Sequence, residues 1–287
     1  MVASSSPAVL KRWIALHLKL LRSEAGHRQQ DAAARIGRTQ QAIVNIEKGA
    51  NLPSAADLEL LLGLYGVPER TDFFRQLLSG ARKKDNWWKA LSEAVPKWFD
   101  LYLGLEAGAA ELNSYDALLV PGLLQTPEYA EATIRADPEL SEEGIRQRVE
   151  LRMGRQQILH RDDEPVRIWA VLDEGVLHRV RGTHAVMAAQ LQHLHEMAQH
   201  PRINIQVLPF TAGAHLGQTG SFNIMRFPPE MADPGIVAVD QLVGGHYYED
   251  PAEVEAYKRA MTQLQDLARD TKDSQRHLST AAKEMNT

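Results

Sequence analysis

The stretch that decides the fold of the N-terminal region runs from Arg28 to Gly49, RQQDAAARIGRTQQAIVNIEKG. Its pattern predicts two short helices joined by a tight turn. Gly37 can adopt the positive φ that a sharp turn after the first helix requires. Thr39 is a suitable N-cap for the second helix, because its hydroxyl can accept a hydrogen bond from an unpaired backbone N–H. Ile43 and Ile46 then mark the buried face of that helix.

Side-chain amides gather at the start of this second helix. Gln40 and Gln41 open it, and Asn45 follows about one turn later, with Val44 beside it. Amides of this kind can bond bidentately to adenine in the DNA major groove, where helix N-termini dock. We therefore expect base contacts from Gln40, Gln41, Val44 and Asn45. A helical hairpin with surface glutamines is the alternative, but it does not require this combination of turn, cap and spacing.

Basic and polar residues flank the two helices. The loop from Gly49 to Pro53 could lay backbone N–H groups along a DNA phosphate. Phosphates are bound mainly by such groups and by basic side chains. We expect phosphate contacts from Arg28, Arg38, Thr39, Lys48 and Asn51.

At these residues the sequence resembles the Xre/Cro-like helix-turn-helix repressors, over roughly Leu10 to Val67. The Ala-x-x-x-Gly spacing of that family is present at Ala33 and Gly37. The resemblance implies a double-stranded DNA-binding domain with the usual five helices. The helical pattern agrees, since it predicts further helices over residues 9–25, from Ser54 to about Gly63 and from about Thr71.

The resemblance also implies roles for three side chains outside the second helix. It places Gln29 against a phosphate and pairs Glu47 with Arg22 as a structural ion pair. One departure is Ala32, where the family usually has a larger apolar residue. Packing of the first helix of the motif is therefore expected to be looser.

The composition is that of an ordinary globular protein. The 287 residues are 44% hydrophobic and 24% charged, and they include no cysteine, which excludes disulfides and thiolate chemistry. No signal peptide is recognisable, and no apolar run approaches the length of a membrane span. We expect a cytoplasmic, nucleoid-associated protein without membrane contact.

Charge is distributed unevenly along the chain. Residues 1–84 carry 13 Lys and Arg against 7 Asp and Glu, a net charge of +6, whereas the remainder carries 19 against 30, a net charge of −11. A basic module on an acidic body suits a DNA-binding head whose attraction to phosphate is confined to one end.

Changes in composition and periodicity predict five segments. The predicted division is a disordered tail (1–8), an all-α DNA-binding domain (9–78), a linker (79–86), a C-terminal regulatory or dimerisation domain (87–269) and a polar tail (270–287). For the C-terminal domain the pattern predicts an α+β fold with a small, mostly antiparallel sheet. Strands are expected at 166–171, 203–208, 221–227, 236–242 and 247–248, and helices at 87–99, 102–112, 126–136, 141–160, 174–179, 184–199 and 251–269.

A second resemblance covers most of the chain after Trp87. The C-terminal domain looks like that of the WhiJ-type regulators of actinomycetes, at Leu105-Glu106, at the run VPGLLQT from Val120 to Thr126, at Tyr129-Ala130, at Val207–Phe210 and at Gly220–Phe222. It implies a transcription factor, often paired with a small partner protein encoded nearby in an antitoxin-like arrangement. The resemblance identifies no ligand.

The histidines do not form a recognisable metal motif. A zinc-protease helix has histidines four residues apart, but His195 and His200 are five apart, which separates them by about 140° around a helix. His193 lies on another face. We therefore expect no metal and no cofactor.

Catalytic motifs are also missing from the sequence. Ser221 lacks the Gly-x-Ser-x-Gly elbow of a hydrolase, and no glycine-rich phosphate loop joins a strand to a helix. The adjacent acids Asp173 and Glu174 are explained by the start of a helix, where the dipole favours negative charge. We expect no enzyme activity.

Two functional hypotheses remain. The first is a homodimeric DNA-binding regulator whose C-terminal domain receives a signal from a small molecule or a partner protein, a description that includes an antitoxin-like role. The second is a ligand-sensing or enzymatic domain with an autoregulatory DNA-binding head. A polar pocket with perturbed acids or bases in the C-terminal domain would favour the second.

Overall fold

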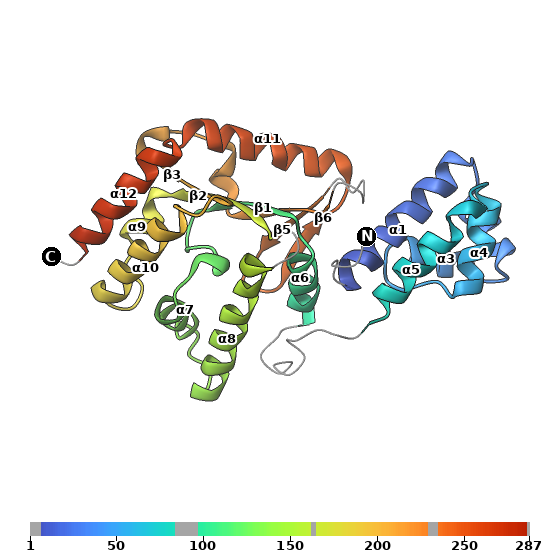
Figure 1. The fold of residues 1–287 in the computed structure, drawn as a ribbon, viewed down its shortest axis with the longest axis horizontal. Helices are drawn as coiled ribbons and strands as arrows, with labels where there is room; N and C mark the ends of the chain where they lie inside the picture. The colour runs from blue at the N-terminus through green and yellow to red at the C-terminus, as the bar shows by residue number, and fades with distance from the viewer. Residues whose placement is uncertain (1–6, 84–96, 162–164, 229–234, 286–287) are drawn as a thin grey trace. The chain divides into compact units, whose positions relative to one another are not determined.

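The computed structural model describes residues 7–83, 97–161, 165–228 and 235–285, in two compact units that divide between Asn86 and Trp87 (Figure 1). Most of the expected tail, residues 84–86 of the expected linker and most of the expected helix 87–99 lie outside the described residues. Pro7 and Ala8 begin the first helix rather than ending a tail, and residues 79–81 end the fifth helix.

The N-terminal unit is the predicted five-helix bundle. Its helices are α1 (Pro7–Glu24), α2 (Gln29–Arg35), α3 (Gln40–Glu47), α4 (Ala55–Leu64) and α5 (Thr71–Ala81), with the 3-10 turn η1 (Pro68–Arg70) before α5. Trp13, Leu58 and Phe74 from three different helices are at most 2% exposed and form part of its core. Burial of this apolar surface holds the short helices α2 and α3, which would not be stable alone.

Local capping fixes the ends of the motif helices as the sequence predicts. The Thr39 hydroxyl accepts the Ala42 N–H at 3.2 Å, and the Ser54 hydroxyl accepts the Asp57 N–H at 3.0 Å. Gly37 has a φ of 65° in the turn between α2 and α3. Ala32 is completely buried, and the looser packing expected around it stays a prediction.

The C-terminal unit is built on one sheet. Its strands are β1 (Glu111–Asp116), β2 (Arg167–Asp173), β3 (Ile203–Leu208), β4 (Phe222–Arg226), β5 (Ile236–Asp240) and β6 (Gly245–Tyr248), in the order β3-β2-β1-β4-β5-β6. The pairings β1–β2 and β2–β3 are parallel and the other three are antiparallel, which confirms the predicted α+β class with a mostly antiparallel sheet.

Helices connect and cover these strands. They are α6 (Lys97–Ala107), α7 (Pro127–Ile134), α8 (Glu142–Arg155), α9 (Glu174–His178), α10 (His184–Met197), α11 (Pro251–Leu267) and α12 (Thr271–Glu284), with 3-10 turns η3 (Gly122–Leu124), η4 (Gln156–His160), η5 (Phe210–Ala212) and η6 (Leu216–Thr219). Among the described residues, no helix combines the length and the apolar character that crossing a bilayer requires.

Strand β1 corrects the predicted helix over residues 102–112. The helix ends at Ala107, and the chain enters the middle of the sheet at Glu111, between β2 and β4. The strand reads ELNSYD, and its polar Asn113 and Ser114 are buried. Polar residues at these positions hide the apolar pattern by which a buried strand is usually recognised.

Alternate side chains place the two faces of the sheet in different surroundings. Tyr115, Phe222 and Val237 share one face and pack against Val254 and Leu264 of α11, which lies along that side of the sheet (Figure 1). Ser114, Asn223 and Ala238 are paired across β1, β4 and β5, so they share the opposite face. That second face carries the polar side chains described below.

The prediction of a polar tail from residue 270 onward is wrong. Residues 271–284 form α12, which packs beside α10 and the edge strand β3. Ser274 and Leu278 are completely buried there, and the Ser274 hydroxyl accepts the Val207 N–H at 3.0 Å. The helix is polar overall because only one narrow stripe of it is buried.

Candidate nucleic-acid interface and charged pocket

The amides predicted to read bases lie together at the N-terminal part of α3. Gln40 and Gln41 are exposed, while Val44 and Asn45 are half-buried. The Gln41 amide donates to Asn45 Oδ1 at 3.0 Å, and Gln30 of α2 donates to Gln40 Oε1 at 3.3 Å. These exposed bonds hold the amides on one surface, where base edges could replace them.

A buried ion pair joins α3 to α1 through Glu47 and Arg22. Glu47 accepts from Arg22 Nε at 2.5 Å and Nη2 at 3.1 Å, so the expected pair is present. Gln29 also donates to Glu47, at 2.8 Å. This bond fixes α2 against α3 and uses one of the two amide N–H groups of Gln29, so the expected phosphate contact of Gln29 stays a prediction.

The expected phosphate-contacting residues divide into two groups. Arg28, Lys48 and Asn51 are exposed at the surface. Arg38 is exposed too but pairs with Asp57 at 3.2 Å, and the Thr39 hydroxyl caps α3 while keeping its own O–H for a donor contact.

Most backbone N–H groups of the loop after α3 are already used within the protein, since those of Gly49, Ala50 and Asn51 all donate to carbonyls of α3. The N–H groups of Ala50 and Asn51 both donate to the Asn45 carbonyl, at 2.8 and 3.1 Å. They close the C-terminal end of α3. The expected phosphate contact of Asn51 therefore rests on its side chain and not on its backbone N–H.

A cavity of about 300 Å³ opens on the polar face of the sheet in the C-terminal unit. Strands β1, β4 and β5 supply its floor, and α6, α8 and the segment around η3 supply its walls. The lining residues are Phe99, Tyr102, Asp116, Leu119, Val120, Pro121, Gly122, Gln125, Ile134, Arg148, Leu151, Arg152, Arg155, Asn223 and Asp240.

A buried ion pair forms one side of this pocket. Arg155 Nε and Nη2 donate to the two carboxylate oxygens of Glu106, at 2.8 and 2.7 Å, with both side chains less than 10% exposed. Burial alone would favour neutral arginine, but the charge and hydrogen bonds of Glu106 hold the pKa of Arg155 above its usual value. The Arg155 guanidinium also lies over the rings of Phe99 and Tyr102, at 5.4 and 5.3 Å.

Arg152, one helical turn earlier, has a neutral partner. It donates to Gln125 Oε1 at 2.7 Å, and among the described residues no carboxylate pairs with it. Burial and the nearby Arg155 lower its pKa to about 10, so it remains charged at neutral pH. Gly122 packs directly on these arginines, since a Cβ there would lie 3.1 Å from both Arg152 Cδ and Arg155 Nη1.

Two acids with raised pKa values line the floor. Burial raises the pKa of Asp116 to about 7, Asp240 adds to the rise, and the Ser114 hydroxyl, 2.6 Å away, opposes it. Burial also raises the pKa of Asp240, although Arg155 and Arg152 offset part of this. Asp116 therefore loses its proton close to neutral pH.

Comparison with known families assigns both units. Residues 13–73 match a helix-turn-helix domain, and residues 99–280 match a domain of unknown function, DUF5753. The second match covers more than half of the chain. This chain belongs to the DUF5753 family. Searches of curated proteins and of solved structures find no match.

The DUF5753 match contains every residue that lines the pocket. Glu106, Gly122 and Gln125 lie in the segments that carried the second resemblance, so a signal for them was present in the sequence. Arg152 and Arg155 were not identified, because they occupy a charged helix that reads as solvent-exposed. The helix-turn-helix match supports a DNA-binding regulator.

Proposed function

We propose that this DUF5753 protein is a sequence-specific transcriptional regulator that reads DNA with α3. The observation that supports the proposal is the helix-turn-helix match together with the exposed amides at the start of α3. The basic N-terminal module adds a general attraction to the phosphate backbone. Base reading then falls to Gln40, Gln41, Val44 and Asn45.

Replacing Gln40 or Gln41 with alanine is expected to remove discrimination at one base pair of each half-site. Each loss is roughly 1–3 kcal/mol, because a bidentate amide contact to one base disappears while phosphate contacts remain. The operator is first selected from random DNA, and affinities for it and its single-base variants are then compared at one salt concentration.

The matched control is Gln76→Ala, which removes an exposed amide from α5. It should leave affinity and base preference unchanged. If Gln40→Ala and Gln41→Ala weakened every DNA sequence equally, the amides would be phosphate or structural residues and the base-reading proposal would fail.

We further propose that the protein binds DNA as a homodimer, because one short helix reads only a few base pairs. Half-sites should then lie about 34 Å apart, or a multiple of that distance. Analytical ultracentrifugation at micromolar concentration tests this, both with and without operator DNA. A strictly monomeric protein under both conditions would contradict it.

The pocket supports a role for the C-terminal unit in receiving a small-molecule signal. It is a polar pocket whose acids, Asp116 and Asp240, have raised pKa values, which is the feature expected of a ligand-sensing domain. A cavity of about 300 Å³ suits a small molecule better than a protein segment. No His, Ser, Thr or Lys is present among its described lining residues, and Arg155 is committed to Glu106, so we propose binding rather than catalysis.

Arg152 indicates the chemistry of this ligand. One of its five N–H donors bonds to Gln125, and no carboxylate among the described residues forms an ion pair with it, although Glu106 and Asp240 attract its charge from a greater distance. We propose that the ligand is a small polar molecule whose carboxylate or phosphate group faces Arg152. A carboxylate ligand, whose charge does not change in this range, should bind more tightly at pH 6 than at pH 8, because Asp116 is largely neutral below its pKa of about 7 and repels an anion above it.

Thermal unfolding of the full-length protein with inorganic phosphate, nucleoside monophosphates and dicarboxylic acids tests this proposal. A ligand at a hundredfold its Kd stabilises the folded state by about 2.7 kcal/mol. The stabilisation should disappear in Arg152→Gln and persist in Arg146→Gln, an exposed arginine of the same helix. Equal shifts in both variants, or none in the wild type, would refute an anion site at Arg152.

A further inference from the structure

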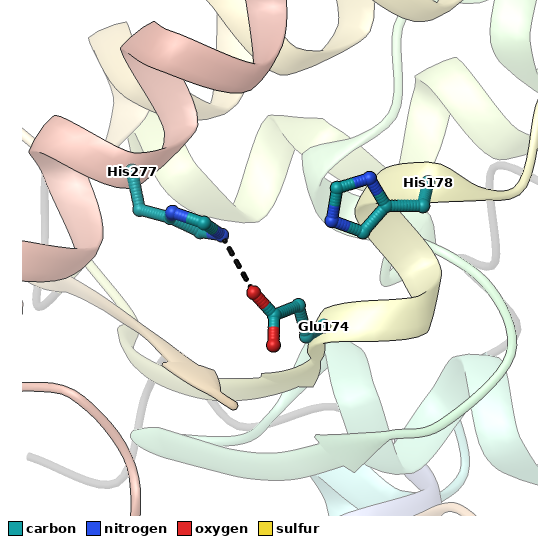
Figure 2. Close-up of side chains that lie close together, drawn as sticks. All are labelled: Glu174, His178 and His277. Carbon is teal, nitrogen blue, oxygen red and sulfur yellow. Dashed lines mark ion pairs between the residues drawn. The ribbon is translucent and has the colours of Figure 1, made fainter. Parts of the chain in front are cut away.

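Three potential metal ligands meet where α9 and α12 lie close together, away from the charged pocket. They are Glu174 and His178 of α9 and His277 of α12, and one ligand atom from each lies within 4.8 Å of the other two. Figure 2 shows the three side chains turned toward one common space. The spacing of four residues places Glu174 and His178 on the same side of α9.

The His277 imidazole lies beside the Glu174 carboxylate without forming a proper hydrogen bond to it. His277 Nε2 lies 3.1 Å from Glu174 Oε1, and these side chains are 24% and 12% exposed. The nitrogen is covered, yet it makes no well-directed hydrogen bond among the described residues. If its lone pair faces the carboxylate, the two atoms repel one another unless a proton or a cation lies between them.

The surroundings orient the carboxylate for such a cation. Glu174 Oε2 accepts the Phe210 N–H at 2.7 Å, which leaves Oε1 directed toward His277. The His178 ring stacks on the Phe210 ring, with centroids 6.0 Å apart. Hydrogen bonds and packing of this kind hold the ligands of metal sites in position.

We propose that Glu174, His178 and His277 bind one Zn²⁺ ion. Two imidazoles and one carboxylate are a ligand set that zinc accepts, whereas Ca²⁺ and Mg²⁺ prefer oxygen ligands. Zinc bonds of about 2.0–2.1 Å place tetrahedral ligand atoms about 3.3 Å apart. The Glu174–His277 distance already fits, whereas the His178 nitrogen, which lies within 4.8 Å of the other two ligand atoms, has to move closer by rotation of its exposed ring.

Arg269 is a positively charged side chain that competes with the zinc ion for the Glu174 carboxylate. Its Nη2 lies 4.0 Å from Glu174 Oε1, but its Nη1 lies closer to Asp273, at 3.3 Å. The arginine therefore keeps an acidic partner when zinc takes Glu174. The bound ion joins the short helix that follows β2 to the last helix of the chain.

Isothermal titration of untagged, chelator-treated full-length protein with Zn²⁺ tests the proposal. One equivalent should bind per chain, and Co²⁺ in its place should show the visible absorption bands of tetrahedral coordination. His178→Gln should weaken zinc binding by at least about tenfold, because one of three ligands is lost. Since His178 is exposed, this variant should fold normally, which circular dichroism verifies.

The matched control is His184→Gln, which removes an exposed histidine at the start of α10. It should bind zinc like the wild type. Zinc should also raise the unfolding temperature of the wild type and of His184→Gln by more than that of His178→Gln or His277→Gln. Zinc binding that survives unchanged in both His178→Gln and His277→Gln, or no binding by the wild type, would overturn the proposal.

Discussion

Replacing Glu106 with glutamine is expected to lower the free energy of unfolding of the C-terminal unit by about 3–5 kcal/mol, because it leaves a buried arginine without its counter-charge. Arg155 is 8% exposed and donates two hydrogen bonds to the carboxylate of Glu106. Arginine does not lose its proton in proteins, so Arg155 cannot compensate for the lost counter-charge by becoming neutral. Glutamine preserves the shape of glutamate but offers one acceptor oxygen instead of two.

Denaturant unfolding of the full-length protein, followed by tryptophan fluorescence and by far-UV circular dichroism, measures this loss. Glu150→Gln is the control, since Glu150 is an exposed acid of α8 and should change stability by less than about 0.5 kcal/mol. The double variant Glu106→Leu with Arg155→Met should recover much of the stability, because buried pairs are often replaceable by apolar side chains. A loss below about 1 kcal/mol in Glu106→Gln would show that water reaches the pair.

Replacing Glu47 with alanine is expected to destabilise the N-terminal unit by about 3 kcal/mol without changing its base preference. Three hydrogen bonds converge on this carboxylate, two from Arg22 and one from Gln29, and it is 4% exposed. Its removal leaves the Arg22 guanidinium, 12% exposed, without an acid and frees α2 from α3.

The comparison variant is Glu59→Ala, which breaks the exposed pair with Arg75 and should cost less than about 1 kcal/mol. Thermal unfolding of the full-length protein gives the stabilities, and selection from random DNA gives the base preference. A changed preference with unchanged stability would mean that Glu47 acts in recognition rather than in the fold.

Features that depend on neighbours in sequence were predictable. Thr39 and Ser54 cap their helices through bonds to residues three positions away, so the short patterns around them are sufficient. The Arg22–Glu47 pair spans 25 residues and came from resemblance to a family rather than from the pattern itself.

Features that depend on distant contacts were missed. Ser114 and Asp116 make β1 look unlike a strand, because one face of it borders a polar pocket. The pair of Glu106 and Arg155 joins positions 49 residues apart, and nothing in either segment alone indicates the other. Glu174 and His178 show metal-ligand spacing, but their third neighbour, His277, comes from a segment expected to be a tail.

The position of α12 affects how the chain can be made. Backbone groups on the outer edge of β3 form hydrogen bonds with residues that are synthesised long after this strand. The Arg269 N–H donates to the Val207 carbonyl, and the Ser274 hydroxyl accepts a hydrogen bond from the Val207 N–H. A nascent chain therefore exposes this edge until residues 269–274 have left the ribosome. Products that stop before Ser274 keep an open strand, which can pair with a second chain and aggregate.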